Sequence, residues 1–463
     1  MRSTTVAVIG AGWAGCAAAV ELTRAGADVT VYEAARTAGG RARRIAYQGQ
    51  SLDNGQHILL GAYRESLRLM QHVGLNPAQL LMRLPLHMRY PLGEDGMSML
   101  TPRLPAPLHL LVGVLLAKGL TLADKLSLAR FSSAARWMGW QLNIDCTVTE
   151  LLARFDQTDR LTKLLWRPLC IAALNIPPER ASAKVFIAVL RDSLGAHRAA
   201  SDMLLPRTDL SALFPDAALA WLQVKGSKVM MGNRVNTIHA QDGGWTVSSE
   251  QGSDHYQHVV IATAATHAQS LLSGIDDALA NQLNFDYEAI TTCYLQYAAT
   301  VRLPAPMLAL IDEPEQQRWG QFVFDRGHLD SAQAGLLSVV ISASGMATQH
   351  AVKTQEVAGL ASTAAQQTQE TPAQSLEAAV AQQLARDLHM PELATPVWSK
   401  AITEKRATFA CVPDMQRPTN ATTHSGCWLA GDYTESDYPA TIEGAVRSGV
   451  KVAAGILGKT TSF

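Results

Sequence analysis

The residues of this chain with the clearest chemical meaning are three glycines near its start. Gly10, Gly12 and Gly15 form a Gly-x-Gly-x-x-Gly pattern directly after an apolar run, and Glu33 ends the next apolar run. Glycines at this spacing let the backbone turn tightly and approach a pyrophosphate, whose charge is attracted by the free amides of a helix N-terminus. A carboxylate at the position of Glu33 can accept hydrogen bonds from ribose hydroxyls. The pattern therefore predicts a dinucleotide-binding site.

A strand, a helix and a second strand must hold these residues in place. We expect the first strand over residues 6–9, a helix that begins after Gly12, and the second strand over residues 28–32. This order is the βαβ unit of a Rossmann-like fold, and it favours a nucleotide site over an ordinary glycine-rich loop. The motif by itself fits NAD as well as FAD.

A second glycine pair follows soon after Glu33. Gly39 and Gly40 allow the backbone to pass close to a cofactor, and Arg41 can pair with a phosphate. The alternative is a solvated basic turn.

The C-terminal region repeats the logic of the opening motif. An apolar run ends in Gly431 and Asp432, and a small-residue helix start follows at residues 439–445. The N-terminus of that helix could stabilise negative charge on a reduced flavin ring, while Asp432 contacts the ribityl or pyrophosphate part.

Composition excludes several classes of partner. The chain of 463 residues has a net charge of −1 and a pI near 6.9, so we expect no nucleic acid. Six scattered cysteines without a Cys-x-x-Cys pair favour a reducing, cytoplasmic compartment and argue against a disulfide framework or a metal site. The first apolar run already belongs to the nucleotide fold, so we expect no signal peptide, and no run is long enough to span a membrane.

The motifs divide the chain into two discontinuous domains. We expect a cofactor domain of the α/β, Rossmann-like class in residues 1–83, 205–270 and 400–463. Together with the second domain, the protein would be α+β overall. A substrate domain with a helical insert and a mixed sheet is expected in residues 84–204 and 271–399.

The helical insert is rich in large apolar side chains. Helical periodicity covers residues 120–140, 148–165 and 183–194. We expect their leucines and tryptophans to pack a core or to form the wall of a pocket for a large apolar ligand. The tryptophans are Trp137, Trp140 and Trp166.

Three other apolar or helical segments are informative. Residues 108–116 form either a helix that docks on a membrane surface or a buried helix that lines an apolar pocket, and the sequence leaves both open. Residues 166–175 form a buried run that Pro168 breaks, and the composition of residues 376–388 is typical of a surface helix.

Taken together, the motifs resemble the FAD-binding pattern of flavin amine oxidases and phytoene-type desaturases. The resemblance rests on residues 10–15, Glu33, residues 39–41, and the terminal segments 431–432 and 440–445. NAD folds share the first motif but not the terminal one, so the resemblance implies FAD and a fold of the amine oxidase type.

A finer resemblance covers nearly the whole chain. Several segments are similar to squalene-associated FAD-dependent desaturases, a family understood as the hydroxysqualene dehydroxylases of bacterial hopanoid biosynthesis. These segments are residues 53–63, 166–175, 405–410 and 431–449. Tyr433 stands where that family leads us to expect tryptophan, and residues 331–379 match nothing that we recognise.

The resemblance also implies the residues of the cofactor site. The pyrophosphate would lie against Gly10, Gly12, Trp13 and Ala14, and the ribose against Glu33. Gly40 and Arg41 would approach the middle of the cofactor, and Val235 would contact the adenine. The flavin would be lined by Gly55, Gln56, His57 and Ile58, and the site completed by Gly431, Asp432, Ala440, Thr441 and Ile442.

The implied reaction is reductive replacement of the hydroxyl group of hydroxysqualene by hydrogen, which gives squalene. Such a reaction needs a proton donor, and His57 and Tyr438 are candidates because they flank motifs expected near the flavin; either could instead be a packing residue. A long-chain isoprenoid substrate implies peripheral contact with the inner face of the cytoplasmic membrane and with upstream squalene-pathway enzymes. The alternatives are an amine oxidase, a carotenoid-type desaturase, or a flavin-binding carrier that does no chemistry.

Overall fold

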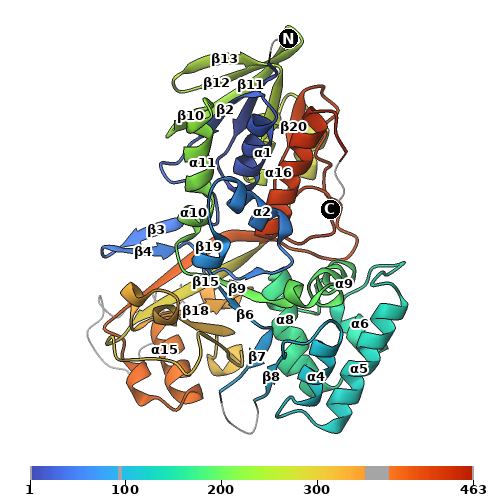
Figure 1. Cartoon of the computed structure of the whole chain (residues 1–463), viewed down its shortest axis with the longest axis vertical. Coiled ribbons are helices and arrows are strands. Elements are labelled where there is room, and N and C mark those ends of the chain that lie inside the picture. The colour runs from blue at the N-terminus through green and yellow to red at the C-terminus, as the bar shows by residue number, and fades with distance from the viewer. Residues whose placement is uncertain (1–2, 92–95, 350–374, 461–463) are drawn as a thin grey trace, which may run out of the picture.

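The computed structural model describes residues 3–91, 96–349 and 375–460, and they form two lobes (Figure 1). One lobe contains a parallel sheet with helices packed against it. The other contains an antiparallel sheet beside a group of helices. The two long strands of the antiparallel sheet reach up to the boundary between the lobes.

The parallel sheet joins strands from distant parts of the chain. Each strand is parallel to its neighbours, and β1 pairs with both β2 and β14. Val6 and Val8 point into the core beneath the helices, whereas Ala7 and Ile9 point into the core on the other face. In spatial order the strands are β10 (Lys228–Met231), β2 (Asp28–Glu33), β1 (Thr5–Ile9), β14 (His258–Ile261) and β20 (Cys427–Leu429).

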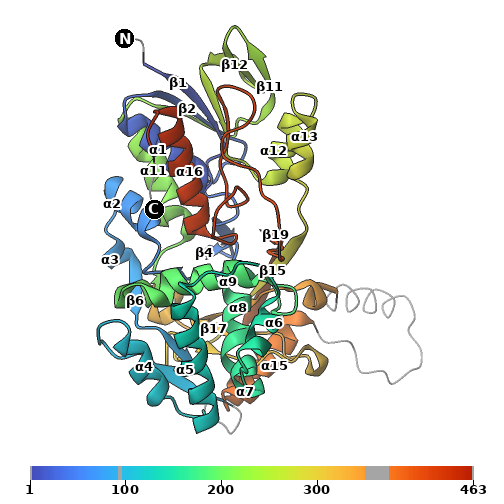
Figure 2. The ribbon, with the colours of Figure 1, turned by 90° about the vertical axis from the view of Figure 1, so that its right-hand side faces the viewer.

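Helices cover one face of this sheet and a three-stranded meander covers the other. Helix α16 (Ile442–Ile456) packs directly on α1 (Trp13–Arg24), with α11 (Pro215–Val224) on the far side of α1 (Figure 2). The approach is so close that a Cβ at Gly449 would lie 2.2 Å from the carbonyl oxygen of Ala14. The meander consists of β11 (Val235–Gln241), β12 (Gly244–Ser249) and β13 (Gly252–Tyr256).

The second lobe is built around an antiparallel sheet. Its spatial order is β16 (Met307–Ala309), β17 (Phe322–Asp325), β18 (Leu336–Ile341), β15 (Tyr287–Gln296) and β19 (Trp398–Phe409). Helix α15 (Leu376–Asp387), expected to be a surface helix, exposes Gln382 and Arg386 to solvent on one side. One face of α15 is buried in the core of this lobe, and the fully buried Gln383 accepts a hydrogen bond from the Gly320 amide.

The helical part of this lobe is more broken than its periodicity predicts. The segment expected as one helix over residues 148–165 is interrupted, and it continues through a π-helical turn at Thr162–Trp166. A second π-helical turn spans Arg191–Gly195. The α-helices are α4 (Leu108–Leu115), α5 (Leu122–Trp137), α6 (Val148–Arg154), α7 (Asp159–Leu161), α8 (Arg167–Leu174) and α9 (Ala183–Leu190).

Three expectations for this helical part require correction. Pro168 does not break α8, because it is the second residue of this helix, in the first turn, where the missing amide costs least. Trp166 is buried as expected, but Trp137 is 90% exposed. In α4 only His109 and Gly113 are buried, so the interpretation of this segment as the buried wall of a pocket was wrong.

Short sheets and helices connect the two lobes. Strand β9 runs between β5 and β6, which brings the chain back from the helical part to the cofactor lobe. The connecting strands are β3 (Arg44–Tyr47), β4 (Gln50–Asp53), β5 (Leu59–Leu60), β6 (Leu81–Leu84), β7 (His87–Arg89), β8 (Ser98–Leu100) and β9 (Met203–Pro206). Other α-helices in the described residues include α2 (Arg64–His72), α3 (Pro77–Leu80), α10 (Leu210–Leu213), α12 (Ala265–Leu272) and α13 (Asp277–Gln282).

We propose the two discontinuous domains that the sequence suggests, with one boundary moved. Strand β19 pairs along its length with β15, so the last segment of the cofactor domain is better begun after Phe409 than at residue 400. Within the described residues, no helix combines the length and the apolar character that a membrane crossing requires.

Candidate cofactor site

A cavity of about 600 Å³ opens at the carboxyl ends of β1, β2 and β14. Ligands of open parallel sheets bind at this edge. The predicted residues that line the cavity are Gly10, Gly12, Trp13, Ala14, Glu33, Gly40, Arg41, His57, Val235, Gly431, Asp432, Ala440, Thr441 and Ile442. The structure therefore brings together residues from motifs at both ends of the chain.

The opening glycines differ in what surrounds them. Gly10 has a φ of +108°, and a Cβ there would lie 2.7 Å from the Ala262 carbonyl oxygen. A Cβ at Gly15 would lie 1.9 Å from the Gly10 carbonyl oxygen. At Gly12, by contrast, the nearest atom to a Cβ would be the Gly40 Cα at 3.9 Å. Gly10 and Gly15 are required by the fold itself, whereas the space at Gly12 is left for a ligand.

Glu33 is held in place at the end of β2. Its carboxylate accepts hydrogen bonds from the amides of Ala11, at 2.7 Å, and Ala35, at 2.8 Å. A carboxylate has further lone pairs beyond these two, so Glu33 can still accept hydrogen bonds from ribose hydroxyls.

Arg41 and Asp432 join the two ends of the site. The Arg41 guanidinium lies 2.5 Å from the Asp432 carboxylate and also donates to the Ala407 carbonyl at 2.7 Å. Burial by itself would lower the pKa of Arg41, but the adjacent Asp432 carboxylate raises it above its ordinary value. Arg41 is thus a permanent cation in the wall of the cavity, where it can face a phosphate.

Helix α16 presents its N-terminus to the same cavity. Thr441 caps the helix, because its hydroxyl accepts a hydrogen bond from the Gly444 amide at 3.1 Å. Thr441, Ile442 and Ala445 line the cavity. The unpaired amides of this first turn and the partial positive charge of the helix suit an anionic or electron-rich group.

His57 is the titratable ring in the cavity wall. Its Nδ1 lies 2.7 Å from the Gly55 carbonyl oxygen, so Nδ1 carries the hydrogen and Nε2 is the free acceptor. Burial lowers the pKa of His57, and the positive charge of Arg41 lowers it further. His57 is therefore neutral near pH 7.

Three predicted flavin-lining residues do not line the cavity in this structure. Gly55 backs onto Thr292 of β15, Gln56 is buried, and Ile58 packs against the apolar core. These residues lie behind His57 rather than beside it in the wall.

Comparison with known proteins decides which family this site belongs to. A family model described as "Flavin containing amine oxidoreductase" matches residues 13–457. The chain belongs to this amine oxidoreductase family. This assignment confirms FAD as the cofactor and confirms that the protein is an oxidoreductase, whereas the role of each residue toward FAD stays a prediction.

Relatives of this amine oxidoreductase extend over its whole length. Hydroxysqualene dehydroxylase of Rhodopseudomonas palustris is 29% identical over 97% of this chain and 98% of the relative. That of Zymomonas mobilis is 26% identical over 96% and 97%. Zeta-carotene desaturase of Synechocystis is 23% identical over 98% and 97%. The family resemblance found in the sequence is thereby confirmed.

A solved structure confirms the predicted fold class. An oxidoreductase from Methanosarcina mazei superimposes with a TM-score of 0.71 over 98% of this chain and 100% of its own. The two sequences are only 14% identical, so this likeness concerns the fold alone.

Tyr438 lies outside the cavity lining of this amine oxidoreductase as far as the described residues show. Its hydroxyl donates a hydrogen bond to the Asp192 carboxylate at 2.6 Å, and the Arg447 guanidinium stacks 4.4 Å from the ring centre. Burial raises the pKa of Tyr438, and the bond to Asp192 raises it further. Tyr438 connects the terminal motif to the π-helical turn of the other lobe.

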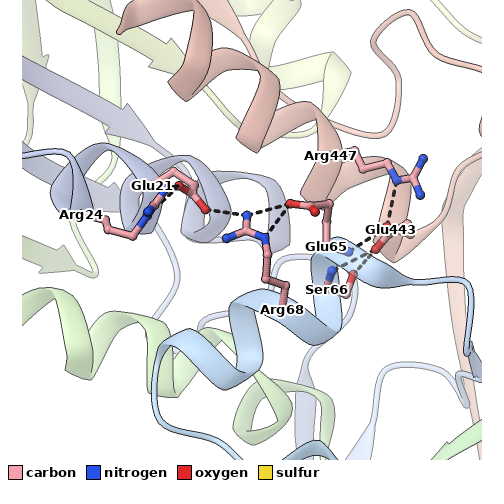
Figure 3. A network of polar contacts seen from close by, with 7 residues as sticks. All are labelled: Glu21, Arg24, Glu65, Ser66, Arg68, Glu443 and Arg447. Carbon is pink, nitrogen blue, oxygen red and sulfur yellow. Dashed lines mark hydrogen bonds and ion pairs between the residues drawn. The ribbon is translucent and has the colours of Figure 1, made fainter. Parts of the chain in front are cut away.

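Sequence reasoning missed the role of Glu443. Its carboxylate is fully buried and accepts hydrogen bonds from the amides of Glu65 and Ser66, from the Ser66 hydroxyl, and from Arg447 (Figure 3). Glu443 thus caps α2 from another helix. No local pattern indicated this cap, although Tyr63, at the N-cap position of α2, has no side-chain cap of its own.

The same polar network continues along the surface of the cofactor lobe. Arg68 of α2 bridges Glu65 on its own helix and Glu21 on α1, and Arg24 also pairs with Glu21 (Figure 3). With Glu443, these contacts connect α2 to α1 and α16, the two helices whose first turns line the cofactor cavity.

Proposed function

We propose that this chain catalyses the FAD-dependent reductive dehydroxylation of hydroxysqualene to squalene. The observation that carries the proposal is the full-length similarity to three proteins named hydroxysqualene dehydroxylase, at 26–29% identity. The cavity supports it, because glycine backbone, Glu33, Arg41 and the α16 N-terminus together suit a flavin dinucleotide. The similarity to a carotene desaturase is weaker, at 23% identity, and supports the alternative less well.

The reaction breaks the allylic C–O bond and forms a C–H bond. The oxygen leaves as water, so the substrate must gain one proton and one hydride equivalent. Bound FAD, in its reduced form, supplies the two electrons and one hydrogen. The remaining proton must come from the protein or from water, and a positioned acid is worth about 10²- to 10⁴-fold in such a step.

Of the two candidate proton donors, we favour His57. His57 lines the cavity, whereas the Tyr438 hydroxyl is engaged with Asp192. Because Nδ1 of His57 donates its hydrogen bond to the Gly55 carbonyl, Nε2 is the nitrogen that takes up a proton and can pass it to the substrate hydroxyl. The lowered pKa makes the protonated form a stronger acid, which suits protonation of a poor leaving group.

Peripheral contact with the inner face of the cytoplasmic membrane is part of the same proposal. Of the twelve large hydrophobic side chains that are exposed in the described residues, nine lie between residues 100 and 144. We call them the leucine-rich face, and they are Leu100, Leu108, Leu111, Leu115, Leu116, Leu122, Leu126, Trp137 and Ile144.

Charge and geometry support a lipid surface as the partner of the leucine-rich face. Leu108, Leu111 and Leu115 recur at helical spacing and so lie on one side of α4. The exposed cations Arg103 and Lys118, which lie before and after α4 in the sequence, suit anionic headgroups. A shared membrane would also bring this chain beside the upstream squalene-pathway enzymes.

Anaerobic mixing of the reduced holoenzyme with hydroxysqualene tests the proposed reaction. We expect the flavin to be reoxidised and squalene to form in equal amount. Hydrogen peroxide formed from a polyamine, or a desaturated carotenoid, would instead indicate the alternative enzymes. If hydroxysqualene leaves the flavin reduced, the chain is a carrier and the proposal fails.

A further inference from the structure

A buried polar network lies directly behind His57. At its centre is Gln56, which is 9% exposed. The Gln56 Oε1 accepts hydrogen bonds from Arg326, at 3.2 Å, and from the Ser338 hydroxyl, at 3.1 Å. Its Nε2 donates to the His57 carbonyl at 3.2 Å. Two donors on one side of the amide therefore fix which end of Gln56 faces His57.

Arg326 belongs to the other lobe and is itself almost fully buried, at 4% exposure. It follows β17, and its Nε donates to the Gln333 side chain at 2.7 Å. In the described part of the chain, no carboxylate lies within 4 Å of Arg326. Burial raises the pKa of the nearby Asp53 carboxylate, and the positive charge of Arg326 opposes that rise. Burying a cation without a direct ion pair is costly, so the hydrogen bonds that Arg326 donates to Gln56 and Gln333 hold it in a defined position.

The backbone before His57 is anchored to the same lobe. The Tyr294 hydroxyl of β15 accepts from the Asp53 amide, at 3.2 Å, and donates to the Asp53 carbonyl, at 3.0 Å. The Gln56 amide donates to the Thr292 hydroxyl at 3.2 Å. These hydrogen bonds fix the backbone at Asp53 and at Gln56. The Gln56 side chain can still rotate, and Arg326 fixes its orientation.

We propose that Arg326 is a positioning residue that acts through Gln56 to hold His57 in the wall of the cofactor cavity. Arg326 contacts neither the cavity nor His57 directly. It orients the amide of Gln56, and that amide holds the His57 carbonyl. The inference rests on FAD binding in the cavity and is independent of which substrate the enzyme reduces.

Flavin binding to the purified full-length chain tests this role without any substrate. We expect Arg326→Gln and Gln56→Leu each to raise the FAD dissociation constant about ten-fold, because each weakens or removes the hydrogen bond that holds the His57 carbonyl. We also expect each to change the shape of the visible flavin absorption bands. Arg302→Gln is the matched control: Arg302 pairs with Asp325, next to Arg326, but is 40% exposed and has no contact with Gln56. The FAD dissociation constant of the Arg302→Gln variant should change less than about two-fold.

A double-mutant cycle separates positioning from general destabilisation. If Arg326 acts through Gln56, the double variant should bind FAD no more weakly than the weaker single variant. Ser338→Ala removes only the second donor to Gln56 and should have a smaller effect of the same kind. Should Arg326→Gln fail to fold, Arg326→Lys and Ser338→Ala carry the test. Multiplying effects in the double variant, or an unchanged flavin spectrum with only a lower unfolding midpoint, would overturn the proposal.

Discussion

The guanidinium of Arg41 lies 2.5 Å from the carboxylate of Asp432, which is 391 positions further along the chain. This ion pair connects the second glycine motif to the terminal motif within the cavity wall. We expect Arg41→Met to weaken FAD binding by roughly ten-fold or more, because a cation is lost and the buried Asp432 is left unpaired. FAD titration measures the effect. Arg36→Met, at an exposed position on the same loop, should bind FAD normally, and equal losses in both variants would contradict the prediction.

Gly12 and Gly15 should respond differently to the same substitution. Gly12→Ala leaves the fold intact, because the new methyl group meets only the Gly40 Cα at 3.9 Å, but it occupies the space left for the cofactor. Gly15→Ala places a methyl group 1.9 Å from the Gly10 carbonyl oxygen and must disrupt the turn. Circular dichroism and flavin content together check this contrast. A Gly12→Ala protein that retains FAD would show that the pyrophosphate lies elsewhere.

The pH dependence of the reaction should follow His57. Because burial and Arg41 hold the pKa of His57 below its usual 6.5, the protonated form becomes populated only as the pH falls below that value. We therefore expect the single-turnover rate of flavin reoxidation by hydroxysqualene to rise as the pH falls from 8 toward the lowered pKa and then to level off.

The variant His57→Asn separates this effect from other titrations. It should slow reoxidation by about 10²-fold and flatten the pH profile while FAD stays bound. A pH profile that is unchanged in His57→Asn would remove His57 from the mechanism. Tyr438→Phe should retain the profile, since the Tyr438 hydroxyl is engaged with Asp192.

Glu443→Ala should destabilise the cofactor lobe. The substitution leaves the amides of Glu65 and Ser66 without their buried acceptor, which costs about 2–4 kcal/mol. Denaturant unfolding of the apoprotein measures the loss. Glu443→Gln retains an acceptor and should lose less, and a value within about 0.5 kcal/mol of the parent for Glu443→Ala would contradict the capping role.

The leucine-rich face should bind membranes. Replacing Leu111 and Leu115 together by aspartate should weaken binding to vesicles with anionic lipids by roughly ten-fold or more. The reason is that both leucines are exposed in the protein and would bury their apolar surface in the lipid on binding. Vesicle sedimentation measures this binding. Val397→Asp is the matched control, because Val397 is 76% exposed but lies outside this face. Equal binding by the double variant and the control would end the docking proposal.

Much of the cofactor lobe could be predicted because its signals are local. Gly10 and Glu33 lie in consecutive elements of one βαβ unit, and the terminal motif repeats the same order of strand, turn and helix. Apolar periodicity likewise predicts α5 and α9 closely. Exposure is not local: the periodicity that predicts α5 does not show that Trp137, at its end, faces solvent.

The parts that could not be predicted depend on contacts between distant segments. Gln56 and Arg326 are 270 positions apart, and nothing near either residue indicates the other. Glu443 caps a helix whose first turn is 377 positions earlier at Ser66. Such pairs carry no periodicity and no motif, so they become visible only when tertiary packing brings the two segments together.

The order of strands in the parallel sheet has a consequence for biosynthesis. β1 is translated before the other strands of this sheet, but one of its neighbours is β14. The other neighbour of β14 is β20, which is translated later still. The cavity is complete only when Asp432 and α16 have been translated. FAD therefore cannot find its complete cavity before α16 has been translated, and one edge of β1 stays unpaired until β14 has been translated.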